Sequence, residues 1–395
     1  MEKKDSSSKY IIKHPVKKGF VSEFFNHMIT YGGFSFENGN MNVWGDPSLF
    51  TPIIGFSIYI NELKKKLGNT TNDILYWIGS LYGRNSTYLL IKKFGFNKKK
   101  IPDFVNGATQ DGFGFIELQT LKDDGKNIKI ILHGTNSALA LKYKKLYGKQ
   151  KNPIDYYMCG ILAGGSEPLF NRDMKCVETK CMAKEEKLCI YTLNNIPKRQ
   201  TPDFFKKLKI DEKLIRKKTE TTSQKRKINF KFFQKKNIKF GDGNFILNGY
   251  VGLNIASYEH VLLDKFTHLL LGEKKFKKIK NKVAKSYIDE TFNKNLISNK
   301  LTSKNIKNVL EKIKLFGFGN LTIHIFKKNT LILKNENNPY LEDQKIIFNK
   351  IDYLGMHMLN KIIRYAFKKY FNKEVSITPM KTSSKISFIK LRFLS

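Results

Sequence analysis

The stretch that decides the fold is residues 155–191, DYYMCGILAGGSEPLFNRDMKCVETKCMAKEEKLCIY. It contains every cysteine of the 395-residue chain, and an acidic residue, Glu178, lies among them. Glu178-x-x-Cys181, followed after seven residues by Cys189, is the spacing of a β-hairpin that closes on a metal ion. Two sulfur ligands and one carboxylate suit a tetrahedral Zn²⁺ ion. The other two cysteines are Cys159 and Cys176.

A metal would have a structural role at this hairpin. The turn Met182–Lys187 is mostly charged, so the hairpin tip has few apolar contacts. A metal that links the hairpin to the preceding helix would fix this corner, and its binding energy would stabilise the fold. Four protein ligands would leave no open position for catalysis. In the alternative interpretation, Cys159 and Cys176 pack in the core and the hairpin thiols face each other without a metal.

The chain repeats one plan. Residues 38–45 (NGNMNVWG) correspond to residues 242–249 (DGNFILNG), and residues 112–118 (GFGFIEL) correspond to residues 317–323 (GFGNLTI). The offset between the copies is nearly constant, which indicates an internal repeat. Helical spacing of apolar residues predicts helices at 58–66, 73–94, 156–170, 258–271, 276–292 and 353–371. Strands are expected at 115–121, 128–133, 188–193, 321–326, 330–333 and 386–391.

The hairpin and the helix before it resemble the end of a 4-vinyl reductase domain. The residues that carry this resemblance are Gly160-Ile-Leu-Ala-Gly164, Phe170-Asn-Arg172, Val177-Glu178-Thr-Lys-Cys181 and Leu188-Cys189-Ile-Tyr. The same domain forms the aromatic-sensing module of phenol- and xylene-responsive transcription activators. Residues 38–90 resemble the dimerising segment that precedes it in those sensors. The resemblance covers residues 36–196 well and 239–393 weakly.

The resemblance implies an α/β (α+β) fold in two similar domains, each an antiparallel sheet with flanking helices, related to the TRAPP vesicle-tethering subunits. We therefore expect an N-terminal extension at 1–35, a zinc-containing domain at 36–196, a basic linker at 197–238 and a metal-free copy at 239–395. The second copy has Ser376, Pro379 and Ser387 near the positions of the hairpin ligands. The related domains dimerise, so a homodimer or an intramolecular pseudo-dimer of the two copies is expected.

The resemblance also implies one structural zinc ion per chain, held by Glu178, Cys181, Cys189 and a residue of the preceding helix. Where the family has a helix cysteine, this chain has Asp155, and its own cysteine is Cys159. These two residues are at i and i+4 on one helix face. Either is a candidate for the fourth ligand. Cys176, which shares a strand face with Glu178, is a weaker candidate.

Sensors of this family bind small apolar or aromatic molecules between the sheet and the helices. Trp77 and Leu81 share a helix face and would form part of the corresponding wall. The resemblance therefore implies a small apolar or aromatic ligand, although each wall residue is also an ordinary core residue. The other residues expected in this wall are Phe104, Phe113, Phe115, His133, Tyr157 and Leu162.

The net charge of +38 is unevenly distributed, because residues 197–395 carry 44 Lys or Arg against 16 Asp or Glu. A coding bias towards lysine explains this charge, since arginine is scarce. Alternatively, the basic second half binds nucleic acid or the ribosome as a polyanion partner. The contact strip would then include Lys206, Lys207, Lys225, Arg226, Lys227, Lys235 and Lys236.

Motifs of other functions are absent from the sequence. It has no P-loop, no G-x-G-x-x-G that opens a helix, no H-E-x-x-H and no G-x-S-x-G. We therefore expect a non-enzymatic binding or sensing protein. The sequence shows no apolar stretch of membrane-spanning length and no export signal, and its thiols have metal-like spacing. These features predict a cytoplasmic protein.

Overall fold

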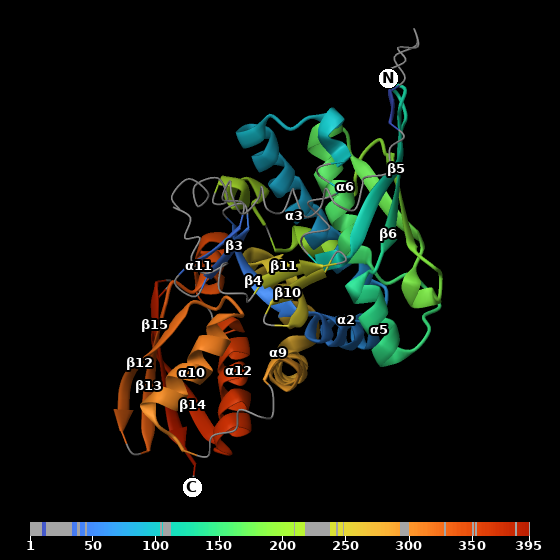
Figure 1. Ribbon diagram of the computed structural model, residues 1–395. Helices are drawn as coiled ribbons and strands as arrows, with labels where there is room; N and C mark the ends of the chain where they lie inside the picture. The colour runs from blue at the N-terminus through green and yellow to red at the C-terminus, as the bar shows by residue number, and fades with distance from the viewer. Residues whose placement is uncertain are drawn as a thin grey trace. The chain divides into compact units, whose positions relative to one another are not determined.

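Two units, each discontinuous in sequence, make up the described part of the chain (Figure 1). The first comprises the described residues within Met1–Tyr31, Leu67–Glu212 and Ile238–Leu253, and the second those within Gly32–Lys66, Lys213–Asn237 and Asn254–Ser395. The computed structural model describes residues 10–12, 34–37, 40–43, 46–102, 105, 112–208, 210–217, 238–241, 244–247, 249–292, 300–327, 329–349, 351, 354–383 and 385–394.

The division into units crosses the repeat predicted from the sequence. Described residues from 34 to 66 belong to the second unit, although the repeat assigns them to the first copy. Conversely, described residues of 238–253 belong to the first unit. The predicted domain boundaries at 36–196 and 239–395 therefore stay a prediction. Most of the expected extension 1–35 and residues 218–237 of the expected linker 197–238 lie outside the described residues.

The first unit contains an antiparallel sheet in the order β1-β5-β6-β8-β7. Along β7 the residues Met174, Cys176 and Glu178 are buried, and they alternate with exposed ones. This alternation is the period of a strand with one buried face. The strands are β1 (Tyr10–Ile12), β5 (Phe115–Asp123), β6 (Ile128–Thr135), β7 (Met174–Lys180) and β8 (Cys189–Asn195).

Helices and a second group of strands complete this unit. The helices are α3 (Thr70–Phe94), α5 (Ala138–Tyr147), α6 (Tyr156–Phe170) and α7 (Asp203–Lys206), with short 3-10 turns η1 (Lys98–Lys100) and η3 (Met182–Lys184). An antiparallel meander is formed by β9 (Ile238–Gly241), β10 (Asn244–Leu247) and the first residues of β11 (Tyr250–Ala256).

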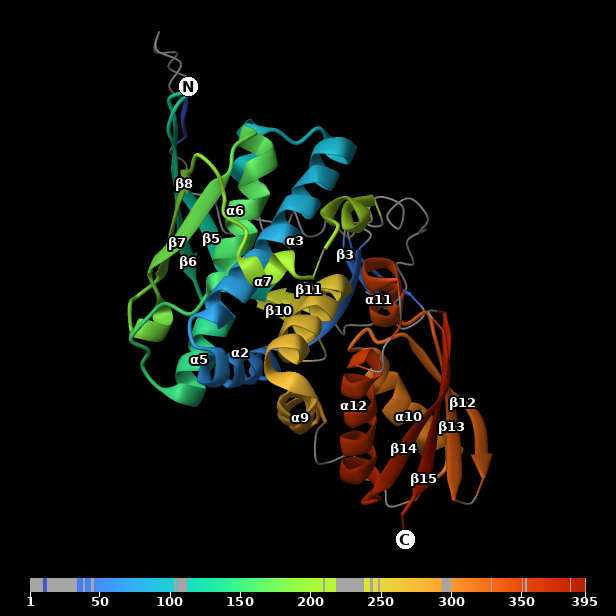
Figure 2. The same ribbon diagram turned by 180° about the vertical axis from the view of Figure 1, so that it is seen from behind.

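The helices α3 and α6 cross with their backbones in direct contact, as Figure 2 shows. Each helix places two glycines four residues apart at the crossing, Gly79 and Gly83 on α3 and Gly160 and Gly164 on α6. A Cβ atom at any of them would lie 1.9–2.2 Å from a carbonyl oxygen of the other helix, for example 1.9 Å from Ser80 O at Gly164. Only glycine allows this approach. The crossing therefore fixes the position of α6, which leads directly into β7.

The second unit contains an antiparallel sheet in the order β12-β13-β15-β14. Its first hairpin is followed by two helices and then by a second hairpin, as for β5, β6, α5, α6, β7 and β8 in the first unit. Helices α10 and α12 pack against this sheet (Figure 1). The elements are β12 (Asn320–Lys327), β13 (Thr330–Glu336), α11 (Pro339–Phe348), α12 (Leu354–Phe371), β14 (Val375–Thr382), β15 (Ile386–Phe393) and α10 (Ser303–Lys314).

The remaining elements of the second unit are β2 (Phe34–Glu37), β3 (Asn40–Val43), β4 (Asp46–Pro52), α2 (Ile53–Leu67) and α9 (Ser257–Thr291). The strands β2, β3 and β4 form an antiparallel meander. Gly272 has φ +75° and interrupts α9 between the two helices predicted at 258–271 and 276–292. None of the described helices has the length and apolar character that a membrane span requires.

The core of the second unit contains a buried polar cluster. Lys280 Nζ lies 2.5 Å from Asp264 Oδ1, and Tyr340 donates a 2.9 Å hydrogen bond to Asp264 Oδ2. His260 Nε2 lies 2.8 Å from Thr51 Oγ1. These residues line a cavity of about 20 Å³, which is enough for a water molecule. The described residues of this unit contain no cluster that could hold a metal ion. The buried carboxylate of Asp264 has Lys280 as its counter-charge.

The fold class and the elements agree with the sequence. The molecule is a mixed α/β structure with antiparallel sheets and flanking helices, as predicted. The helix predicted at 156–170 coincides with α6, and the other expected helices and strands are present with ends that differ by a few residues. The helices α5, α10 and α11 were not predicted, although Ile306, Val309, Leu310 and Ile313 of α10 have the i, i+3, i+4, i+7 spacing of an amphipathic helix.

Replacing Gly164 with alanine tests the helix crossing. Alanine is the better helix former by about 1 kcal/mol, so helix propensity alone predicts a more stable protein. The added Cβ would collide with Ser80 O, and the two helices would have to separate. We expect Gly164→Ala to lower the free energy of unfolding by about 1–3 kcal/mol, measured by chemical denaturation. A Gly164→Ala variant more stable than the wild type would contradict the close backbone contact between α3 and α6.

The second unit should lose stability in mild acid. Burial lowers the pKa of His260 to about 3 and that of His357 to about 4, both below the ordinary value of 6.5. The unfolded state then binds protons at a higher pH than the folded state, so this stability is complete above pH 6.5 and declines as the pH falls towards 4. Denaturation midpoints between pH 7 and pH 4 should fall less steeply for His260→Gln than for the wild type. The control His133→Gln should keep the wild-type slope, and an unchanged slope for His260→Gln would disprove this origin.

Candidate metal centre and the adjacent groove

The hairpin of β7 and β8 brings Glu178, Cys181 and Cys189 together. Their ligand atoms all lie within 4.8 Å of one another, and all three residues are buried. Glu178 is in β7, Cys181 follows the end of that strand, and Cys189 begins β8. A register shift between Glu178 and Lys180 precedes this corner. The three residues therefore form a cluster that could hold a metal ion.

The charges of the cluster favour a bound cation. Burial raises the pKa of Glu178, and burial together with Glu178 raises the pKa of Asp155 to about 8. Neither carboxyl forms an ion pair with a lysine or arginine in the part of the chain described here. Glu178 Oε1 is buried without a hydrogen-bond donor, while Oε2 accepts a 3.0 Å bond from the Asp155 amide. An unpaired buried charge is costly, so the donor set fits a divalent metal.

The thiols of the cluster are prepared to act as ligands. A hydrogen bond from Cys189 lowers the pKa of Cys181 to about 6, which favours its thiolate. The same bond raises the pKa of Cys189. The Met182 amide also donates to Cys189 Sγ over 3.4 Å. Since a metal binds the thiolate form, Cys181 is the better prepared of the two ligands.

The two candidates for the fourth ligand lie beside the cluster and outside the group within 4.8 Å. Asp155 is the N-cap of α6, and its Oδ1 accepts a 3.2 Å bond from the Met158 amide. Its Oδ2 accepts a 3.3 Å bond from Tyr191. Cys159 is one turn further along α6, and its thiol interacts with Cys176. The structure thus brings three of the five expected ligands together.

Six of the eight expected pocket residues, Leu162 included, are buried in the first unit, and Phe104 lies outside the described residues. Trp77 stacks on Phe205 with ring centroids 4.1 Å apart, and Phe113 contacts Tyr157 at 5.5 Å. Leu81 and Phe115 are also buried. His133 is only partly buried and alternates with the buried residues Leu132 and Gly134 on β6, so it lies on the other sheet face. None of the seven described residues lines the small cavity of the second unit or the groove beside the cluster.

A groove of about 760 Å³ runs beside the cluster in the first unit. Six consecutive residues of the edge strand β7, Met174 to Thr179, line one wall. Asn72, Asp73 and Tyr76 of α3 line another. The remaining lining residues are Pro153, Tyr156, Cys159, Lys184, Ile196, Lys198, Arg199 and Gln200. This volume lies within the range of small-molecule sites.

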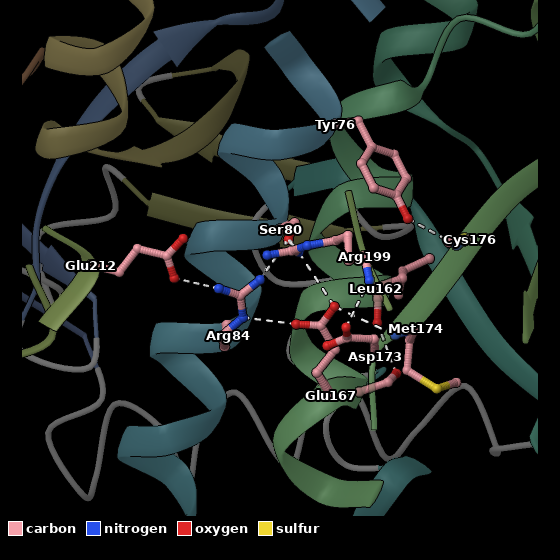
Figure 3. Close-up of polar contacts among 11 residues, drawn as sticks. Tyr76, Ser80, Arg84, Leu162, Glu167, Asp173, Met174, Cys176, Arg199 and Glu212 are labelled. Atoms are coloured by element: carbon pink, nitrogen blue, oxygen red, sulfur yellow. Dashed lines mark hydrogen bonds and ion pairs between the residues drawn. The ribbon is translucent and has the colours of Figure 1, made fainter. Parts of the chain in front are cut away.

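A network of buried charges holds one wall of the groove, as Figure 3 shows. Arg84 of α3 donates a 2.8 Å bond to Glu167 of α6, and it also pairs with Glu212. Arg199 reaches the same Glu167 at 3.3 Å and bonds Ser80. The Arg199 amide donates a 2.7 Å bond to Asp173. The segment after β8 is therefore anchored to both helices.

Apart from Cys159, Cys176 and Glu178, the residues of the groove and of the network were not predicted. Arg84 and Glu167 are 83 residues apart in sequence, and their charges are unremarkable in so basic a chain. A usable signal exists only on α3, where Asn72, Asp73 and Tyr76 share the face of a helical turn.

The expected nucleic-acid strip is described only at its start. Lys206 is exposed in α7, and its ammonium pairs with Asp203 at 2.7 Å. Lys207 is exposed next to it. Lys225, Arg226, Lys227, Lys235 and Lys236 lie outside the described residues. This strip stays a prediction.

Comparisons with known proteins bear on the fold. No family model matches the chain, and no curated protein matches it. Among solved structures it is similar to the phenol-responsive sensory domain of the transcription activator PoxR with phenol, at 11% identity and a TM-score of 0.40, over 47% of this chain and 94% of that one. It is also similar to a vinyl-4-reductase family protein from Methanocaldococcus jannaschii, at 21% identity and a TM-score of 0.23, over 31% of this chain and 68% of that one. Both are proteins of the kind that the sequence resembles.

Removing Glu167 should destabilise the first unit. Its side chain is 8% exposed and faces two arginines that are 12% and 17% exposed. Glu167→Ala would leave both guanidinium groups without this counter-charge, and we expect a loss of about 3 kcal/mol in the free energy of unfolding. The exposed pair of Lys206 and Asp203 provides the control, because Asp203→Ala should change little. Equal losses of unfolding free energy in Glu167→Ala and Asp203→Ala would show that the network stabilises the fold no more than an exposed ion pair does.

Proposed function

We propose that the chain is a non-enzymatic small-molecule-binding protein of the sensory type, whose first unit is stabilised by one structural zinc ion. The observation that carries the proposal is the juxtaposition of the Glu178, Cys181 and Cys189 cluster with the 760 Å³ groove. Glu178 belongs to both, and Cys159 and Cys176 of the groove wall lie beside the cluster. The ligand expected there is a small molecule with apolar or aromatic character.

Zinc is the metal that the donor set favours. Two thiols and a carboxylate are ligands that tetrahedral Zn²⁺ accepts, whereas magnesium and calcium prefer oxygen alone. We assign the fourth position to Asp155, since its amide already contacts Glu178 and the Cys159 thiol is occupied with Cys176. When bound, the ion would crosslink the hairpin to the start of α6. It would thereby hold the β7 wall of the groove.

The second unit is proposed as a metal-free copy of the first. In support, both units follow the same order of strands and helices, and their sheets are ordered β5-β6-β8-β7 and β12-β13-β15-β14. The second unit has no cysteine in its sequence. The intramolecular pseudo-dimer, the homodimer and the cytoplasmic location stay predictions.

Metal content tests the zinc centre. Elemental analysis of the purified chain should find one zinc ion, and Cys181→Ser should lose it because the substitution removes one of the two sulfur ligands that favour zinc. Asp155→Asn should lower the zinc content, whereas Cys159→Ser should keep it. The matched control Cys176→Ser should also keep it. Zinc that persists in Cys181→Ser would disprove the site, and loss in Cys159→Ser alone would move the fourth ligand to that residue.

Native mass spectrometry of the cell-purified chain tests ligand binding. We expect a bound small molecule that leaves on gentle denaturation. Val177→Trp, which places a bulky side chain in the groove wall, should reduce its occupancy while the zinc content stays unchanged. A chain that carries zinc and takes up no small molecule, from cells or from an added library, would reduce the proposal to a structural metal protein.

A further inference from the structure

The charges around the groove are unbalanced. Four cationic side chains line it, against the two acidic residues Asp73 and Glu178. Arg199 is already paired with Glu167, and Glu178 is buried in the cluster. Three lysines then remain opposite one aspartate. These lysines are Lys175, Lys184 and Lys198.

These three lysines are available to a ligand. None of them forms an ion pair with a carboxylate among the residues that the structure describes. Lys175 and Lys198 are exposed, on β7 and on the segment after β8 respectively. Asp73 is the one acidic side chain of the groove that faces them outside the cluster. The groove therefore has a surplus of positive charge that its own carboxyl does not neutralise.

The α3 wall of the groove offers a fixed hydrogen-bond donor, the Tyr76 hydroxyl. The Tyr76 hydroxyl oxygen accepts a 3.0 Å bond from the Cys176 amide, as Figure 3 shows. This bond uses the oxygen as an acceptor, so the hydroxyl proton is free to be donated. Burial raises the pKa of Tyr76, which keeps that proton in place.

A second polar group on the same wall lacks a partner. Asn72 Oδ1 is buried and has no hydrogen-bond partner. A 180° rotation of its side-chain amide exchanges the oxygen for the nitrogen. Asn72 can therefore serve a ligand as donor or acceptor. An unsatisfied buried polar group of this kind is uncommon and calls for a partner.

The groove also offers apolar surface. Val177 is 48% exposed, which is unusual for a valine in a strand that otherwise buries its apolar residues. Tyr156 and Pro153 lie on the opposite wall, at the start of α6. A ligand that fits both properties has a compact apolar or aromatic body and a negatively charged head.

We propose that the groove binds a small organic carboxylate, with its head group between Lys175, Lys198 and the Tyr76 hydroxyl and its body against Tyr156 and Val177. This inference rests on the proposed function, because it names the ligand class of the same site. Neutral hydrocarbons are not the preferred ligands in this inference, because they bring no negative charge to the lysines. Charge-assisted hydrogen bonds are stronger than neutral ones, so the head group should contribute most of the selectivity.

Two probes that share one ring system test the charge. Isothermal titration of the full, zinc-loaded chain in 150 mM salt would compare 2-naphthoate with its neutral analogue 2-naphthamide. We expect the carboxylate to bind about tenfold more tightly than the amide. Equal binding would overturn the anion inference and leave the proposed function standing. Failure of both probes and of a panel of aliphatic and aromatic acids to bind would overturn the proposed function as well.

A matched pair of double variants distinguishes the groove from the general basicity of the chain. Lys175→Gln with Lys198→Gln removes two charges at the groove, whereas Lys122→Gln with Lys129→Gln removes two exposed charges on β5 and β6. The groove variant should weaken 2-naphthoate binding about tenfold and leave 2-naphthamide unchanged. The control should change neither. Equal losses in both variants would show a nonspecific attraction to a basic protein and would overturn the site.

Discussion

The first unit depends on the contact between the backbones of α3 and α6. Glycines on both helices permit an approach that any side chain would block, as at Gly83 and Gly164. Because α6 begins at Tyr156, after its N-cap Asp155, and leads into β7, the crossing sets the distance between α3 and the edge strand. That distance determines the width of the groove, and it places Tyr76 against the Cys176 amide. The helix crossing and the hairpin cluster thus build one corner of the molecule.

The buried carboxylates of the molecule do not all have a counter-charge. In the second unit, Asp264 is paired with Lys280 and with Tyr340, so its charge is balanced within the core. In the first unit, Asp155 and Glu178 are buried close together with no lysine or arginine beside them in the described part of the chain. Glu167, elsewhere in the first unit, pairs with two arginines, so the missing cation is a specific feature of the hairpin cluster. A metal ion is the simplest group that would supply it.

Local patterns predicted the elements and the metal cluster, because both depend on spacing along the chain. The helix α6 and the hairpin follow from glycine, cysteine and glutamate positions between 155 and 191. The pattern could not show that residues 34–66 pack in the second unit, since apolar periodicity does not identify the partner of a strand. His133 was expected in the pocket and lies on the other face of the sheet. A shift of one position along a strand is enough to move a side chain to the opposite face. The groove was missed because its lysines come from separate segments of a chain that is rich in lysine.

The central claim is that Glu178, Cys181 and Cys189 hold a zinc ion at this corner. X-ray absorption at the zinc edge of the purified chain tests it most directly, since it reports the ligands themselves. The account predicts two sulfur ligands at about 2.3 Å and two oxygen ligands at about 2.0–2.2 Å. Three sulfur ligands would assign Cys159 in place of Asp155. A shell without sulfur, or a chain without zinc, would contradict the account.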